Sequence, residues 1–238
     1  MSSELIALYI TAASIGFFHT IFGPDHYLPF IVMKKARGWS INRTLIITLA
    51  CGIGHILSSI LLGAVGIFLG IHIMRLEFLE SFRGNLAAWA LIGFGFSYLL
   101  WGIRKAIQNK PHSHIHAHHD EGIRHHHDHS HDYGHIHLHG KKEKRNITPW
   151  VMFTIFVLGP CEPLIPILMY PASKSSALGV VMTATIFGFV TVSTMLGVVL
   201  VASYGISFVK IRHLERYSHA LAGAAILFCG IAIQFLGL

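Results

Sequence analysis

The sequence predicts an all-α, polytopic membrane protein, and three features of its composition support that fold class. Hydrophobic residues make up 53% of the 238 residues, charged residues only 12%, and the mean hydropathy is +0.58. Several apolar stretches exceed the roughly 20 residues that a helix needs to cross a hydrocarbon core about 30 Å thick. Most charged residues gather between these stretches. This composition excludes an ordinary soluble domain.

Continuous apolar runs predict six transmembrane helices. Their expected ranges are 5–33, 44–71, 86–107, 149–170, 177–205 and 217–237. The first run follows Glu4 rather than a basic segment and no small-residue cleavage site follows it, so we expect a retained span. The chain then divides into three parts. These are a first three-helix repeat (1–107), a His-rich connection that we expect to be largely disordered (108–148), and a second three-helix repeat (149–238).

Basic residues are distributed unevenly among the connections. Of the 18 Lys and Arg residues, fifteen fall after the first, third or fifth predicted helix, and only Arg75, Arg83 and Lys174 fall on the other side. The positive-inside rule therefore predicts a multi-pass protein of the inner or plasma membrane, with both termini outside and the His-rich connection in the cytoplasm. The net charge of +7 reflects this orientation, and we expect no nucleic-acid partner.

Two short patterns recur in the two halves of the chain. A Gly-Pro step with further prolines interrupts the first predicted helix at Gly23 and the fourth at Gly159. The segment 54–63 of the second helix also aligns without gaps with 188–197 of the fifth. Because each half holds three spans, the second copy must be inverted in the membrane. Inverted repeats with broken helices are typical of secondary transporters, which bind their substrate near the breaks.

Ionisable and metal-ligating side chains cluster near these breaks. An imidazole or carboxylate at membrane depth is costly unless it is paired, neutral or facing an aqueous cavity. Nitrogen, oxygen and sulfur ligands together suit nickel, cobalt, zinc or copper better than magnesium or calcium. A packing role is the alternative for His55 taken alone, and a small apolar filler is the alternative for Cys161. The candidate metal ligands are His19, Asp25, His26, His55, Cys161 and Glu162.

The connection between the halves has a different composition. Thirteen histidines lie between residues 112 and 139, interleaved with four acidic residues. An internal, irregular tract of this kind is not an expression tag, and its composition predicts binding of divalent metal. The candidate loop ligands are His112, His114, His116, His118, His119, His125, His126, His127, His129, His131, His135, His137 and His139.

The residues from His19 to His26 resemble the His-x4-Asp-His signature of the nickel/cobalt transporter superfamily, with five residues instead of four before Asp25. The Gly54-His55-x-x-Ser58 element is similar to a later motif of the efflux and urease-accessory-type branch. The resemblance implies transport of nickel or cobalt and leaves its direction open. The broken helices predict alternating access, with proton exchange as the natural driving force and the bilayer as partner. The His-rich loop lies on the cytoplasmic donor side, which favours efflux slightly over uptake. We expect no enzyme activity and no permanently bound cofactor.

A second resemblance competes with the first. The segment Gly159-Pro160-Cys161-Glu162-Pro163 is similar to the Pro-Cys-x-x-Pro segment of transmembrane thiol–disulfide electron carriers that serve cytochrome c maturation. Such carriers shuttle a disulfide between two cysteines, and here Asp25 occupies the mirrored position. The sequence therefore ranks this alternative second. Also open are a metal-sensing scaffold without transport, and assembly as a homo-oligomer or with an accessory subunit.

Overall fold

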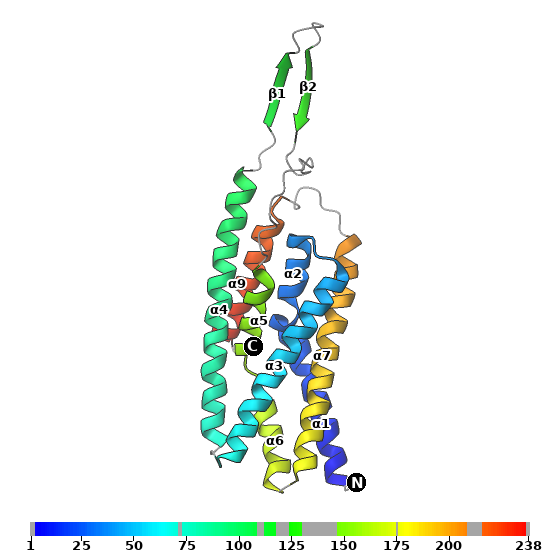
Figure 1. Ribbon diagram of the computed structural model, residues 1–238, viewed down its shortest axis with the longest axis vertical. Coiled ribbons are helices and arrows are strands. Elements are labelled where there is room, and N and C mark those ends of the chain that lie inside the picture. The colour runs from blue at the N-terminus through cyan, green and yellow to red at the C-terminus, as the bar shows by residue number, and fades with distance from the viewer. Residues whose placement is uncertain are drawn as a thin grey trace.

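The computed structural model is an elongated bundle of helices with a two-stranded extension at one end (Figure 1). It describes residues 3–70, 73–108, 112–117, 124–129, 147–174, 176–208 and 216–236. Its elements are α1 (Ser3–Phe22), the short 3-10 helix η1 (Pro24–His26), α2 (Leu28–Arg37), α3 (Ile41–Phe68), α4 (Ile73–Gln108), β1 (His112–Ala117), β2 (Arg124–His129), α5 (Thr148–Leu158), α6 (Leu164–Ser173), α7 (Ala177–Phe208) and α9 (Ser218–Leu236).

In the part of the chain that the structure describes, five helices are long and apolar enough to cross a membrane. They are α1, α3, α4 from Met74 onward, α7 as far as Gly205, and α9. The helices α5 and α6 are apolar but shorter, at 11 and 10 residues. The expected helical, multi-pass membrane class is therefore confirmed at this level.

The first and fourth predicted spans are each interrupted. Between α1 and α2 lie Gly23, η1 and Tyr27, and between α5 and α6 lie residues 159–163. Proline explains both interruptions, because its ring removes a backbone donor and clashes with the preceding turn. The α1–α2 pair and the α5–α6 pair run in opposite directions along the bundle (Figure 1). The left-handed Gly38 (φ 64°) ends α2.

The helix α4 is longer than the sequence predicts. It begins at Ile73, whereas the expected third span begins at residue 86. The added turns contain Arg75, Glu77, Glu80 and Arg83, whose charges exclude this stretch from an apolar window. Glu80 and Arg83 nevertheless form an i,i+3 ion pair with an Nη1–Oε1 distance of 2.8 Å. Pairing makes these charges compatible with a helix inside the bundle.

Close backbone contacts hold the bundle together. The helix α4 packs along α9, α1 along α7, and α3 against both α5 and α7. At Gly223 in α9, an added Cβ would overlap the backbone of Leu99 in α4. Small residues of this kind let membrane helices approach closely. Lipid is as apolar as the helix surface, so van der Waals contacts, and not the hydrophobic effect, stabilise the pairing. The α4–α9 contact therefore depends on glycine.

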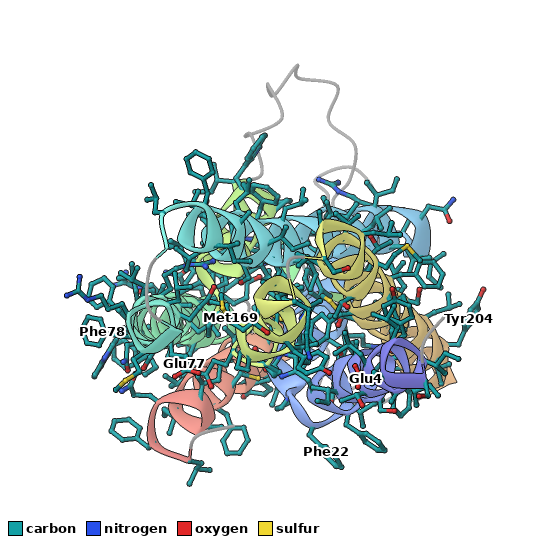
Figure 2. All side chains as sticks on the ribbon, turned by 90° about the horizontal axis from the view of Figure 1, so that it is seen from below. Glu4, Phe22, Glu77, Phe78, Met169 and Tyr204 are labelled. Carbon is teal, nitrogen blue, oxygen red and sulfur yellow. The ribbon has the colours of Figure 1, made fainter. Side chains whose placement is uncertain are left out.

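Large apolar side chains cover the outside of the bundle. Viewed along the bundle axis, Phe22, Phe78 and Tyr204 project outward from the helices (Figure 2), with exposed fractions of 69%, 70% and 56%. A soluble protein rarely exposes so much contiguous apolar surface. Contact with the lipid bilayer accounts for it.

The connection between the halves contains the antiparallel strands β1 and β2, paired from His112–His129 to Ala117–Arg124. These strands extend beyond the end of α4, at the opposite end of the molecule from the N-terminus (Figure 1). The rest of this connection lies outside the described residues, and its expected disorder stays a prediction. The division of the chain into two repeats and a loop likewise stays a prediction.

Candidate functional site

Both helix breaks face one cavity of about 670 Å³. Side chains from α1, α3, α4, α5 and α9 complete its wall. Its polar lining includes His19, Asp25, His26, His55, Ser81, Asn85, Glu162 and Gln234. Backbone released from helical hydrogen bonding at membrane depth is tolerated only where protein or a polar cavity meets it. The cavity therefore surrounds polar side chains whose burial in lipid would cost free energy.

Three histidines meet at this cavity. His19 lies near the end of α1, His26 in η1 and His55 in the middle of α3. One ring nitrogen from each can be chosen so that all three lie within 4.8 Å of one another. The ring centroids of His19 and His26 are 4.7 Å apart, and those of His26 and His55 are 5.2 Å apart. The break after Phe22 brings His19 and His26 together, although an unbroken helix would set them two turns apart.

Hydrogen bonds fix the orientation of two of these rings. Nδ1 of His26 lies 3.2 Å from the Gly23 carbonyl oxygen and 3.2 Å from Oδ1 of Asp25. Nδ1 of His55 lies 3.3 Å from the Phe156 carbonyl oxygen. A carbonyl oxygen can only accept, so both Nδ1 atoms carry the proton and donate. In a neutral ring, Nε2 then keeps its lone pair.

The other predicted ligands lie in different surroundings. Asp25 is in direct contact with His26, and its side chain is 25% exposed. Glu162 lines the same cavity but is not in the histidine cluster. Cys161 is fully buried on the other side of the break, in an apolar cluster with Ile56 and Phe187. Of the six predicted residues, five therefore share the cavity and one does not line it.

A polar clamp holds the second break, and the sequence-based prediction missed it. Nη2 of Arg83 donates to Ser58 Oγ (2.7 Å) and to the carbonyl oxygens of Val157 (2.9 Å) and Gly159 (3.4 Å). Glu80 accepts from the backbone N–H of Cys161 at 3.3 Å. These bonds occupy carbonyls that the end of α5 leaves without helical partners. The spacing of Glu80 and Arg83 on one helix face was the signal that could have indicated the clamp.

The predicted loop ligands are only partly covered by the structure. His112, His114 and His116 lie in β1, and His125, His126, His127 and His129 lie in β2. The other loop histidines lie outside the described residues: His118, His119, His131, His135, His137 and His139. Their role in metal binding stays a prediction.

A family model described as the cytochrome C biogenesis protein transmembrane region matches residues 28–232. The matched range runs from the start of α2 almost to the end of α9 and contains the second break. The chain belongs to this family. A comparison with curated proteins and a comparison with solved structures gave no match.

Membership of the cytochrome C biogenesis transmembrane family corrects two predictions from the sequence. The assignment to the nickel/cobalt transporter superfamily is wrong, and transport of nickel or cobalt is not supported. The error came from motifs of eight residues or fewer around Asp25 and His55, whereas the family match extends over both halves. The second resemblance, which rested on the Pro160-Cys161 segment, agrees with the family.

The cytochrome C biogenesis family match changes the reading of the three cysteines. Cys51, Cys161 and Cys229 are all buried and free, and they lie on α3, the second break and α9. Of the three, only Cys161 lies within a Gly-Pro break. Any thiol chemistry at the breaks is therefore concentrated at one sulfur.

Proposed function

We propose that this protein carries reducing equivalents across the membrane by thiol–disulfide exchange at Cys161. The observation that supports this function is the family match over residues 28–232, which includes Cys161 in the interrupted segment between α5 and α6. Broken helices beside a midplane cavity are where carriers of the inverted-repeat type handle their cargo. Here the cargo is a pair of electrons rather than a metal ion.

A single sulfur can complete the exchange. The Cys161 thiolate attacks the disulfide of an acceptor protein, which forms a mixed disulfide and releases one acceptor thiolate. A thiolate of a donor dithiol then attacks the Cys161 sulfur, so the acceptor leaves with both thiols reduced. The second donor thiol attacks the new mixed disulfide, which oxidises the donor and restores the Cys161 thiol. The net reaction moves two electrons and two protons from donor to acceptor, and no resident cofactor takes part.

This cycle requires the Cys161 sulfur to become accessible. Its side chain is 0% exposed, although Pro160, Glu162 and Pro163 on either side line the cavity. The segment 159–163 has no helical hydrogen-bond ladder of its own, and Glu80 and Arg83 hold it from α4. A rotation of this segment that releases the clamp would turn the thiol toward the cavity. The break therefore acts as the moving part of the carrier.

We also propose the finer architecture that this role requires. The short helices α5 and α6 together make a sixth span, and the two halves form an inverted repeat around the cavity. The opposite directions of the α1–α2 and α5–α6 pairs support this arrangement (Figure 1). The end that carries Arg37, Lys105 and the strands faces the cytoplasm, where the donor dithiol is available. The acceptor disulfide lies on the N-terminal side.

Trapping of the mixed disulfide tests the function. Cells that produce the full-length protein are quenched with acid, alkylated, and compared by non-reducing electrophoresis. We expect a reductant-sensitive adduct in the wild type, in Cys51→Ser and in Cys229→Ser, and no adduct in Cys161→Ser. Covalent c-type haem in the cell envelope should fall at least about tenfold in Cys161→Ser. The two other cysteine variants serve as matched controls because each removes a buried thiol that lies outside residues 159–163.

Two results would contradict the proposal. One is a Cys161→Ser strain with wild-type levels of covalent haem and wild-type reduction of envelope disulfides. The other is an adduct that persists in Cys161→Ser and disappears in Cys229→Ser. The second result would move the exchanging sulfur to α9.

A further inference from the structure

The cavity contains a feature that thiol exchange does not use, and we propose that it is a metal site. His19, His26 and His55 bind one Zn²⁺ or Cu⁺ ion through their Nε2 atoms. The family match says nothing of a metal at these positions. The site does not depend on the thiol chemistry proposed for Cys161.

Unpartnered nitrogen atoms provide the first evidence. The Nε2 atoms of His19, His26 and His55 are buried, and none has a hydrogen-bond partner among the described residues. His26 and His55 are each 3% exposed. A buried polar atom without a partner costs about 1–3 kcal/mol. Three such atoms on neighbouring rings therefore indicate a group that the protein chain itself does not supply.

The protonation of the rings provides the second evidence. Because the Nδ1 atoms of His26 and His55 donate to backbone carbonyls, their Nε2 atoms present lone pairs. Metal-bound histidines show this same pattern, in which the distal nitrogen donates to a carbonyl or carboxylate and fixes the tautomer. For His26, the Asp25 carboxylate adds the acceptor typical of carboxylate–histidine–metal arrangements.

The geometry suits a small transition-metal ion. Three imidazole nitrogens at about 2.0–2.1 Å from a metal lie about 3.5 Å from one another. One ring nitrogen from each histidine can be chosen so that the three lie within 4.8 Å of one another, and rotation of the side chains would close the site. One water molecule can donate only two hydrogen bonds, so it satisfies the three Nε2 atoms only if the Nε2 of His19 carries a proton, whereas a cation satisfies three lone pairs at once.

The ligand type selects the class of ion. Imidazole nitrogen favours zinc and copper over magnesium and calcium. Three histidines with a fourth position open toward the cavity match the ligand number of exchangeable zinc sites. Asp25 offers one negative charge beside the cluster, which compensates Cu⁺ fully and Zn²⁺ in part. Zn²⁺ and Cu⁺ both bind imidazole nitrogen, and the binding experiment below determines which of the two ions the site takes.

The histidine-rich connection would mask a single site, so the test removes its ligands and keeps the full chain. All thirteen loop histidines are replaced by glutamine, and the purified protein is equilibrated in detergent with Zn²⁺, or anaerobically with Cu⁺, at metal concentrations set by a competing chelator. We expect one ion per chain for at least one of the two metals. X-ray absorption should show nitrogen or oxygen neighbours at about 2.0 Å.

Variants in this background locate the ion. His55→Gln can still donate to the Phe156 carbonyl and should weaken binding at least about tenfold. The combined His19→Ala, His26→Ala variant should abolish binding. His219→Gln is the matched control, since His219 is a membrane-helix histidine held by Tyr98 and Lys105 and should leave affinity unchanged. Thermal unfolding without metal checks that each variant folds.

Independence from the proposed function is tested with Cys161→Ser, which should keep the ion. If disulfide trapping fails but metal binding is retained, the thiol function is wrong and the metal site is supported. If trapping succeeds but no metal binds, the metal site is wrong and the thiol function is supported. Equal metal content in the histidine variants and their parent would overturn the site. So would the absence of both Zn²⁺ and Cu⁺ from the parent, because a water molecule or a shared proton would then fill the cluster.

Discussion

The carboxylate of Glu80 accepts a hydrogen bond from the backbone N–H of Cys161, 81 residues later in the chain, over 3.3 Å. Through its ion pair with Arg83, the same carboxylate is linked to the carbonyl oxygens that end α5. Ser58 joins this network and also donates to the carbonyl oxygen of His55. The helix break with the candidate thiol and the helix with a candidate metal ligand are therefore connected by one set of polar contacts.

Removing the cation of the clamp should destabilise the protein. Arg83→Gln leaves Glu80, which is 1% exposed, without its counter-charge, and we expect a loss of about 3 kcal/mol in the free energy of unfolding. Unfolding in mixed micelles at increasing denaturing-detergent concentration measures the loss. Arg75→Gln is the control, because Arg75 is exposed on the same helix and its replacement should cost no more than about 0.5 kcal/mol.

The double variant Glu80→Gln, Arg83→Gln separates charge from packing. It removes both charges together, so it should be more stable than Arg83→Gln alone. Equal stability of Arg83→Gln and the wild type would show that the clamp contributes nothing. A double variant less stable than the single one would show that the hydrogen bonds of Glu80 matter more than its charge.

The sequence was sufficient to predict the membrane class, the interruptions at Gly23 and Gly159, and the meeting of His19, His26, Asp25, His55 and Glu162 at one cavity. Hydropathy, the helix-breaking effect of proline and the cost of burying ionisable groups depend on residue type and on short segments, so the sequence alone is enough to apply them. The same reasoning gave the approximate positions of α3, α7 and α9.

The start of α4 and the family could not be predicted in this way. Glu80 and Arg83 look like loop residues in a hydropathy window, since only the folded bundle reveals their partners on α3 and at the second break. The placement of Cys161 behind the break depends on which face of a short irregular segment meets α3 and α7. The family was assigned wrongly because the His and Asp motifs cover eight residues or fewer, whereas the family match extends over residues 28–232.

The α4–α9 contact should not tolerate a side chain at Gly223. Because a Cβ there would overlap the backbone of Leu99, Gly223→Ala should push the two helices apart and destabilise the protein by about 1–3 kcal/mol. Gly205→Ala in α7 meets nothing within 4 Å and should be neutral or slightly stabilising, since alanine is the better helix former. Thermal unfolding in detergent compares the two variants, and equal midpoints would exclude tight backbone packing at this point.

The proposed orientation makes a simple labelling prediction. Cysteines introduced at Ser3 and Ser218, in a background without the three natural cysteines, should react differently with a membrane-impermeant maleimide added to intact cells. Ser3→Cys should react from outside, because it belongs to the N-terminal side of α1. Ser218→Cys begins α9 near the basic end and should react only after the membrane is opened. The opposite pattern would invert the topology and place the end with Arg37, Lys105 and the strands outside.

Metal binding by the loop should depend steeply on pH. Metal binds the neutral form of imidazole, whose unperturbed pKa is about 6.5, so protons displace the ion as pH falls. At pH 7.5 the wild type should bind several more Zn²⁺ ions per chain than the variant with thirteen glutamines, and at pH 5.5 this difference should vanish. Equilibrium dialysis measures both values. Several ions bound by both proteins at pH 5.5 would assign that binding to the acidic residues, and a difference that persists at pH 5.5 would contradict displacement by protons.

Asp25 should act on the proposed metal site by positioning His26 rather than by binding the ion. Its Oδ1 accepts from Nδ1 of His26 at 3.2 Å, while the three histidines alone form the cluster of converging ligand atoms. Asp25→Asn keeps an oxygen acceptor but removes the charge, so we expect metal affinity to fall about 10–100-fold, with unfolding of the metal-free protein unchanged.

Glu162→Gln provides the matched comparison in the same loop-substituted background. Glu162 lines the cavity but lies outside the histidine cluster, so its replacement should change affinity less than about threefold, below the effect expected of a residue in the second coordination shell. X-ray absorption of Asp25→Asn should still show three imidazole neighbours, because the ligands themselves remain. If the number of ligands drops in Asp25→Asn, the carboxylate is itself a ligand. If affinity falls equally in both variants, the effect comes from the charge of the cavity as a whole and not from the hydrogen bond to His26.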